Sequence, residues 1–450
     1  MTKVLLKNLN SPESTFSKMF RKISQFSAVN YEYLIGTLAG VLVFRKPATI
    51  AIIVFTAISL LAFDNLKWRR KYGLPIVLIA LPVLLDVFFL WNNVNLGDGF
   101  KHLEKRASLL LFPVILLCYK HPLDLRRILK VYSSVFTILL IALLVRFAII
   151  ENELFIKLIT GDHPWEMGYT YAKSMNLHAP AVNMHVAFLV MAHTFIIVTG
   201  LKTYTTARLS IRISLLLASL FLLLYLNTRV AVSLGLLGML VIVAIELGKR
   251  WSRKKVLAYT TGFVLLIVVA VSAFAKAYPF MIEKYTTRSF ANLDMIGRLD
   301  EFENPEITVY SSLVTRLSIW KTSIDRASDD LWIGVGAADG KDELNQAYVD
   351  TDQKFLATYK FPTHNQYIDF LLKFGLLGFI ATIAFMLHIL WISIRLRHTL
   401  AFMFFVLFTL SNLTDDYLIR FDGITFSALW ISLFATLYWR GRIDKDQLVG

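Results

Sequence analysis

The sequence predicts an all-α protein that crosses a membrane many times, through about 12 helices. Hydrophobic residues make up 56% of the 450 residues and the mean hydropathy is +0.58, whereas soluble domains are roughly 45–50% apolar. These residues gather in long runs, and about 20 consecutive apolar residues suffice for one transmembrane helix. Because backbone groups in lipid must be paired within the segment, runs this long favour helices over barrel strands.

The predicted spans form two groups separated by one long polar segment. Nine spans lie within residues 31–277 and three within 366–439, with polar tails at 1–30 and 440–450 and the long segment at 278–365. The fourth span is shorter than the others. The twelve predicted spans are 31–44, 48–65, 74–92, 107–119, 128–150, 181–200, 208–226, 229–248, 256–277, 366–394, 400–416 and 423–439.

The distribution of Lys and Arg predicts the orientation of these spans. Basic residues concentrate in alternate short loops, such as 66–72, 120–130 and 249–255, and are sparse in the loops between them. Since basic loops stay in the cytoplasm, both termini are expected to be cytoplasmic and the segment 278–365 to lie outside. This pattern accounts for most of the net charge of +15, so we expect a lipid bilayer and no nucleic acid as partner.

The outer segment 278–365 is too long for a simple connection, and its composition indicates order. Residues 311–327 have helical spacing, with an expected apolar face at Leu313, Leu317, Trp320 and Ile324. The apolar strip 331–336 ends in a glycine turn. We expect a few short helices on the outer face of the bundle, with apolar bodies from Tyr310, Trp320, Trp332, Tyr348, Phe355, Tyr359 and Phe361.

His364 is a candidate for proton transfer at the start of the tenth predicted span. It follows Pro362 and precedes Asn365, a sequence that favours an extended approach to a helix. Histidine is the side chain whose ordinary pKa lies nearest neutrality. The alternative interpretation is an interfacial histidine that only caps or anchors the helix.

The same span carries an expected ion pair and two small residues. Asp369 and Lys373 are four residues apart, so their charges can neutralise each other on one helix face. Gly375 and Gly378 would let a neighbouring helix approach closely.

Two arginines are candidates for binding an anion. Arg229 lies at the hairpin between the seventh and eighth predicted spans. A charge near the hydrocarbon boundary either marks a substrate pathway or extends towards lipid headgroups. Arg316 lies on the predicted helix of the outer segment, where a solvated or salt-bridged surface arginine is the alternative.

Other chemical signals are weak. The sequence contains no phosphate-binding Gly-x-x-x-x-Gly-Lys-Ser/Thr loop, no His-Glu-x-x-His pair and no cysteine cluster, so ATP use and zinc chemistry have no support. The paired acids at 329–330 and 415–416 could hold Mg²⁺, but such pairs are more typical of solvated loops. His178, His185 and His193 surround the sixth span without a matching carboxylate. Cys118 is the single cysteine.

Several short motifs together resemble the O-antigen ligase and polymerase superfamily. They are Thr228–Ala231, Thr315–Trp320, Ile333–Gly336, His364–Asn365 and Gly375–Gly378, in this order around a long outer loop between the ninth and tenth spans. The resemblance implies a multi-pass glycosyltransferase of the bacterial inner membrane. Such an enzyme takes a glycan from an undecaprenyl diphosphate carrier on the periplasmic face, and in the ligase branch transfers it to lipid A-core oligosaccharide in an inverting, metal-independent reaction without a cofactor.

The resemblance also implies roles for individual residues. Arg229 and Arg316 would clamp the diphosphate, since guanidinium groups match phosphate oxygens and stay protonated. His364 would orient or deprotonate the acceptor hydroxyl. Arg106, His178 and His185 are further candidates for the pocket, although no motif supports them.

Alternatives remain open at this point. A polymerase would use a second carrier-linked glycan as acceptor, and a protein O-oligosaccharyltransferase would use a Ser or Thr hydroxyl. A transporter or flippase for the lipid-linked glycan would use Asp86, Arg146, Asp369 and Lys373 as charges along a pathway. A purely structural membrane protein is a further alternative.

Overall fold

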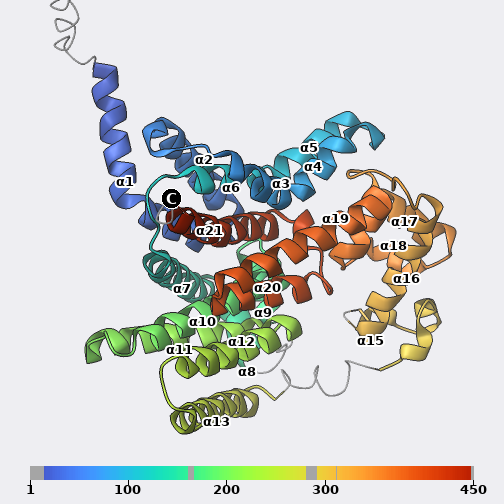
Figure 1. The fold of residues 1–450 in the computed structure, drawn as a ribbon. Helices are drawn as coiled ribbons and strands as arrows, with labels where there is room; N and C mark the ends of the chain where they lie inside the picture. The colour runs from blue at the N-terminus through green and yellow to red at the C-terminus, as the bar shows by residue number, and fades with distance from the viewer. Residues whose placement is uncertain (1–14, 161–166, 280–290, 311, 447–450) are drawn as a thin grey trace, which may run out of the picture.

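The computed structural model describes residues 15–160, 167–279, 291–310 and 312–446. Regular structure in these ranges is helical, apart from one isolated antiparallel bridge between Leu66 and Tyr119. The prediction of an all-α polytopic membrane protein is therefore confirmed (Figure 1). Seven described helices are long and apolar enough to cross a membrane: α7 (Leu125–Ile150), α10 (Ala179–Gly200), α11 (Thr206–Leu226), α12 (Arg229–Gly248), α13 (Arg253–Ala277), α19 (Gln366–Leu396) and α21 (Phe421–Asp446).

The other predicted spans are shorter or bent helices. Residues Arg70–Ile79 and Leu81–Phe88 form one bent pair with an angle of 75°, which makes eight spans if it crosses as a unit. All twelve predicted segments lie on helices, but length and composition mark only seven or eight of those in the described ranges as spans. The remaining segments lie on α1 (Thr15–Val41), α2 (Arg45–Leu61), α6 (Ser108–Cys118) and α20 (Thr399–Ser411).

The bend between α3 (Gly73–Ile79) and α4 (Leu81–Phe88) follows from the sequence. Pro82 lies in the first turn of α4, where it lacks an N–H and its ring clashes with the preceding turn of a continuous helix. The chain then forms α5 (Leu96–Arg106), which begins where the side chain of Asn95 accepts a hydrogen bond from the N–H of Gly97.

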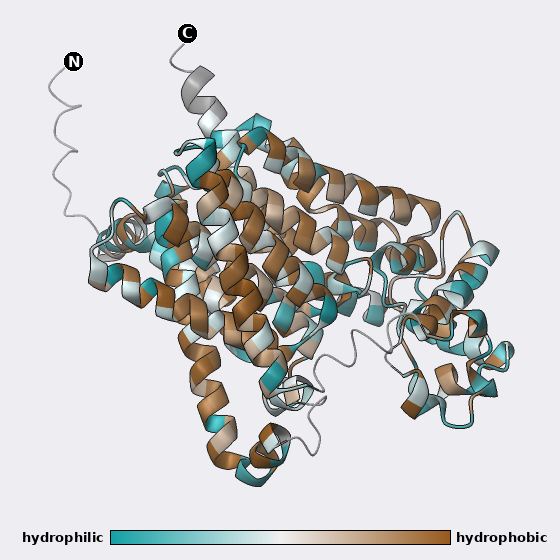
Figure 2. Cartoon of the chain, turned by 90° about the horizontal axis from the view of Figure 1, so that it is seen from below, coloured by the Kyte–Doolittle hydropathy of each residue, from teal (hydrophilic) through white to brown (hydrophobic). Residues whose placement is uncertain are grey.

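Helix α10 is the centre of the bundle. Helices α7, α11, α12, α20 and α21 pack around it, and nearly all its side chains are buried. Helix α13 instead packs beside α12 and has no buried side chain, as expected for a helix that faces lipid. Apolar residues cover the long helices, and hydrophilic residues collect at their ends and in the group of short helices at one side (Figure 2).

Local signals set the ends of these helices. The side chains of Asp124 and Thr205 cap α7 and α11. Between α11 and α12, Asn227 ends the first helix in the left-handed conformation, with φ 48°. Thr228 follows directly, so Arg229 becomes the first residue of α12.

Short helices fill the described part of the segment between α13 and α19, residues 291–310 and 312–365, as predicted. They have their own hydrophobic core, to which Val314, Ile319, Tyr348, Phe355 and Phe361 contribute. The segment lies beside the N-terminal end of α19 (Figure 1). Its elements are η5 (Leu293–Met295), η6 (Leu299–Glu301), α15 (Pro305–Thr308), α16 (Leu313–Asp329), α17 (Gly340–Asp350) and α18 (Lys354–Tyr359).

The predicted apolar face of α16 is wrong. Its buried face consists of Val314 and Ile319 with small polar residues, including Ser318 and Ser323, while Ile324 is exposed. The serine hydroxyls donate to carbonyls one turn earlier, so they can be buried against α17 and α19. Trp332, expected to fill this core, is 70% exposed.

Helix α19 is broken at Gly375, and the strip 331–336 pairs with the backbone groups that the break leaves without helical partners. Gly375 has φ 63° and ψ −155°. The N–H groups of Val335 and Gly336 donate to the carbonyls of Leu372 and Lys373 (both 3.0 Å), and Leu376 N–H donates to the carbonyl of residue 331 (2.7 Å). The predicted close approach at Gly375 therefore exists, but the partner is this strip and not a neighbouring helix.

Candidate active site

His364 occupies a constrained position just before α19. Asn365 caps the helix by accepting hydrogen bonds from the N–H groups of Tyr367 and Ile368. His364 itself has φ 47°, in the left-handed region that is costly for a residue with a side chain. Its Nδ1 lies 3.4 Å from Oδ1 of Asp415, and the side chain is 19% exposed. The imidazole is thus in contact with Asp415 through Nδ1 and remains partly accessible to a substrate.

Asp415 and Asp416 are buried, so the expectation that they are solvated loop acids is wrong. The two residues are 3% and 0% exposed. The loop between α20 and α21 folds inward because Gln366 binds it twice, through its N–H to the carbonyl of Asn412 (2.9 Å) and through Oε1 to the N–H of Leu418 (2.7 Å). The acids at 329–330 are exposed, as expected.

Basic groups surround the buried carboxylates. The Nη2 of Arg420 lies 3.8 Å from Oδ1 of Asp415, and its Nε lies 3.6 Å from Oδ1 of Asp416. The Nδ1 of His178 lies 3.8 Å from Oδ2 of Asp415. Asp415 therefore contacts His364, His178 and Arg420, which join the starts of α19, α10 and α21.

The two neighbouring carboxyls titrate in opposite directions. Burial alone would raise the pKa of Asp415, but the hydrogen bond with His364 and the charge of Arg420 outweigh it and lower that pKa. Burial and then the negative charge of Asp415 raise the pKa of Asp416. Burial and then the charge of Arg420 lower the pKa of His178 to about 4. At neutral pH Asp415 is a carboxylate and His178 a neutral imidazole.

His364, Asp415 and Asp416 have the donor types of a cation site. Their ligand atoms lie within 4.8 Å of one another, a grouping that a divalent cation could bridge. Arg420, however, already lies against both carboxylates. A permanent guanidinium charge therefore balances this cluster from within the protein.

Three arginines lie at helix starts near this cluster. Arg229 is the first residue of α12, Arg316 the fourth of α16, and Arg420 directly precedes α21. The positive end of the helix dipole disfavours a cation there and favours a bound anion. The arrangement therefore costs stability and suits a negatively charged ligand.

Tyr169, on α9 (Met167–Ser174), lies within electrostatic range of several of these groups. Its pKa is raised, first by burial of the hydroxyl, and the charges of Arg316, Asp415 and Arg229 all act on it. Arg316 also acts on His178. The charges of the two predicted arginines and of the carboxylate that contacts His364 therefore all reach one tyrosine, a residue that is 47% exposed.

Sequence reasoning did not single out Tyr169 or Arg420. Arg420 follows the two acids within one short loop, and this local combination of opposite charges was the signal available. Tyr169 stands in no recognisable motif, and only the packing of α9 against α10 and α11 brings it to the site.

Arg106 and His185 lie apart from this cluster. Arg106 is 1% exposed, pairs with Asp86, and donates from Nε to the carbonyl of Leu418 (3.0 Å). It therefore supports the loop that carries the two acids. His185 is buried in α10 with its ring centroid 4.0 Å from that of Phe426. Only His178, of these three predicted pocket residues, contacts the cluster.

The other charges proposed for a transport pathway are mostly paired. Lys373 and Asp369 form the predicted ion pair at 2.7 Å, with both side chains 5% exposed. Asp86 is paired with Arg106, and Arg146 is exposed on the outer surface of α7. These placements therefore give little support to a transport pathway lined by charges.

Comparisons with known proteins agree with the resemblance drawn from the motifs. A family model described as O-antigen ligase matches residues 213–383, a range that contains Arg229, Arg316 and His364. An uncharacterized protein of Haemophilus influenzae is 25% identical over 366 residues, which cover 80% of this chain and 83% of that protein. The predicted resemblance to the O-antigen ligase-like superfamily is thereby confirmed.

Proposed function

We propose that this membrane protein, whose central region matches the O-antigen ligase family, transfers a glycan from undecaprenyl diphosphate to lipid A-core oligosaccharide at the periplasmic face. The observation that carries the proposal is the contact of His364 with Asp415 beside arginines at three helix starts. A base and an anion site, side by side, are what glycosyl transfer from a diphosphate requires.

The arginines would act on the donor. As the bond between the anomeric carbon and the diphosphate oxygen breaks, negative charge grows on the diphosphate. Arg229 and Arg316 can donate several N–H groups to its oxygens, and the helix starts add the positive end of two dipoles. Both side chains are partly exposed, so a membrane-bound diphosphate can reach them.

His364 would act on the acceptor. Since Nδ1 faces Asp415, Nε2 is the ring atom that can take the proton of the acceptor hydroxyl. The hydroxyl oxygen then bonds to the anomeric carbon on the face opposite the departing diphosphate, which inverts the configuration. Asp415 stays charged and stabilises the imidazolium that forms. The diphosphate leaves on its lipid, and the proton passes from His364 to water.

No nucleotide is needed in this proposal, because breaking the sugar diphosphate bond supplies the free energy. The arginines would neutralise the charge of the leaving diphosphate, the task that a metal ion performs in other transferases. In this proposal Tyr169 and His178 would contact the glycan, because both arginines act on Tyr169 and His178 contacts Asp415. Their hydroxyl and neutral imidazole can form hydrogen bonds with a glycan without adding charge.

The test is the glycan profile of a strain that lacks this protein. We expect loss of polymer from lipid A-core, restored by the wild-type chain and not by His364→Ala. Removing a general base should lower transfer by roughly 10²-fold or more, while membrane insertion stays at the wild-type level.

Other profiles would identify other functions. Core bearing single repeat units would indicate a polymerase, and loss of glycan from proteins alone a protein O-oligosaccharyltransferase. Carrier-linked glycan trapped at the cytoplasmic face would indicate a transporter. Normal transfer by His364→Ala would remove His364 from the mechanism.

A further inference from the structure

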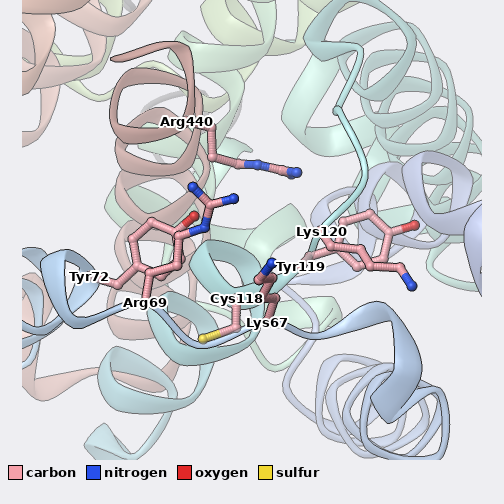
Figure 3. Close-up of a pocket in the computed structure, with 7 residues that line it drawn as sticks. All are labelled: Lys67, Arg69, Tyr72, Cys118, Tyr119, Lys120 and Arg440. Atoms are coloured by element: carbon pink, nitrogen blue, oxygen red, sulfur yellow. The ribbon is translucent and has the colours of Figure 1, made fainter. Parts of the chain in front are cut away.

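A basic pocket lies beside the last turns of α21 (Figure 3). The candidate active site is at the other end of this helix. Its volume is about 80 Å³, several times the roughly 10–15 Å³ that one water needs. Four of its seven lining residues are basic and none is acidic. The lining consists of Lys67, Arg69, Tyr72, Cys118, Tyr119, Lys120 and Arg440.

Hydrogen bonds to backbone carbonyls bring the segments that carry Lys67, Lys120 and Arg440 together. The bridge between Leu66 and Tyr119 joins two loops that are distant in sequence. Within it, Lys67 N–H donates to the carbonyl of Cys118 (2.6 Å), and Lys120 N–H donates to the carbonyl of residue 65 (2.8 Å). Arg440 reaches the same loop from α21 and donates to the carbonyl of residue 121. The clustering is therefore built into the fold.

The acid that acts on Tyr119 of the pocket is already engaged by groups outside the pocket. Glu32 lies close enough to act on Tyr119, but its oxygens bind the guanidinium of Arg127 (2.8 Å) and the N–H of Asp124 (2.6 Å). The pKa of His121 is lowered, first by burial and then by Lys120 and Arg440. The pocket thus keeps a positive field that favours an anion.

The pocket lies at membrane depth for a lipid headgroup. The apolar part of α21, Phe421–Gly441, has 21 residues, and at about 1.5 Å per residue it measures about 30 Å, the thickness of the hydrocarbon core. Arg420 and Arg440 are therefore at opposite membrane faces. Beside the pocket, Trp68 and Phe63 are 60% and 58% exposed, as is common for aromatic residues at a membrane interface.

We propose that this pocket binds a phosphate group, supplied by the headgroup of an anionic phospholipid. The guanidinium group of Arg69 suits two phosphate oxygens, and Lys67 and Lys120 add point charges at the rim. The exposed aromatic residues would contact the acyl region next to that headgroup. This site is independent of the proposed glycosyl transfer.

The test measures binding of phosphatidylglycerol to the full-length protein in neutral detergent, by native mass spectrometry. The variant Lys67→Gln/Lys120→Gln removes two pocket charges, and Lys254→Gln/Lys255→Gln removes two exposed charges from α13 as a matched control. Wild type and control should bind alike, and the pocket variant should bind about 30-fold more weakly. Thermal unfolding without lipid checks folding, and Lys120→Gln alone replaces the double variant if that variant is unstable.

A second arm identifies the source of the phosphate. Inorganic phosphate is titrated at constant ionic strength against chloride, with the unfolding temperature as readout. Stabilisation of wild type by phosphatidylglycerol but not by inorganic phosphate supports a lipid site, and stabilisation by inorganic phosphate alone overturns the lipid assignment. Equal binding by the pocket and control variants, or no binding by wild type, overturns the site.

Discussion

His364 is not needed to start its helix. Asn365 provides the cap of α19, so the alternative role of His364 as a helix cap is contradicted. The left-handed backbone of His364 costs on the order of 1 kcal/mol or more of folding free energy. In this conformation the imidazole lies against Asp415. A position that lowers stability to aim a titratable group is typical of functional sites.

At Arg316 we predict that charge alone is insufficient. Arg316→Lys keeps the positive charge but loses the fork that matches two phosphate oxygens, so transfer in membrane vesicles should fall by roughly tenfold or more. Lys321→Ala, an exposed change on the same helix, is the control and should transfer normally. Wild-type rates in Arg316→Lys would assign Arg316 a structural role.

At Asp416 we predict a pH-dependent gain in stability on substitution. Its folded-state pKa is raised above the unfolded value, which is about 3.9. Between these two values the folded state holds a proton that the unfolded state has released, so this group destabilises the fold as pH rises. Asp416→Asn removes the effect.

The measurement for Asp416→Asn is thermal unfolding across pH 4 to 8 in detergent. Its advantage over wild type should grow with pH, by about 1.4 kcal/mol for each unit by which the folded pKa exceeds the unfolded one. A difference from wild type that does not change with pH would refute the raised pKa.

At the scale of elements, the break in α19 fixes the outer segment to the bundle. The strip 331–336 uses the hydrogen-bonding groups that Gly375 leaves free, and so sets α16, with Arg316, relative to the start of α19. The short helices are therefore attached to the membrane helices at this joint between the strip and α19. The position of Arg316 relative to His364 depends on it.

We predict that Gly375→Ala damages this joint. A Cβ there would lie 2.4 Å from the carbonyl carbon of Trp332, and φ is 63°, so substitution strains the backbone as well as colliding. The unfolding temperature and glycan transfer should both fall, with a free-energy loss of about 1–3 kcal/mol. Gly262→Ala, where nothing lies within 4 Å of the added Cβ, should be unchanged or slightly stabilised; equal effects at both positions would contradict the proposed role.

At the scale of the whole molecule, α21 separates two charged sites. The candidate active site lies at its first residues and the basic pocket at its last turns. The distribution of basic residues predicts that the first end is periplasmic and the second cytoplasmic.

Cysteine labelling tests this orientation. In a Cys118→Ser background, Lys341→Cys on α17 and Lys254→Cys on α13 each introduce one exposed thiol. A membrane-impermeant maleimide should label position 341 in intact cells with a permeable outer membrane, and position 254 only after lysis. The reverse pattern would invert the topology and place the proposed transfer in the cytoplasm.

Much of the fold and part of the site could be predicted from local sequence. Hydropathy and helix-starting residues are properties of neighbouring positions, so the twelve apolar segments all proved helical. Boundary positions identified His364 and Arg229 as candidates, and the motif resemblance added weight to Arg316 on its predicted helix. The buried face of α16 could not be predicted, because serine and threonine can be buried when their hydroxyls bond within the helix.

The sequence by itself determined the membrane class and the helical segments, and it supplied His364, Arg229 and Arg316 as candidates for the site. Only the tertiary structure decided that Asp415 and Asp416 are buried, that Arg420 balances them, and that Arg106 supports their loop. The physical reason is that span formation depends on residues adjacent in the chain. The environment of a loop carboxylate depends instead on partners from distant segments, such as Gln366 and Arg106, which only packing brings within hydrogen-bonding distance.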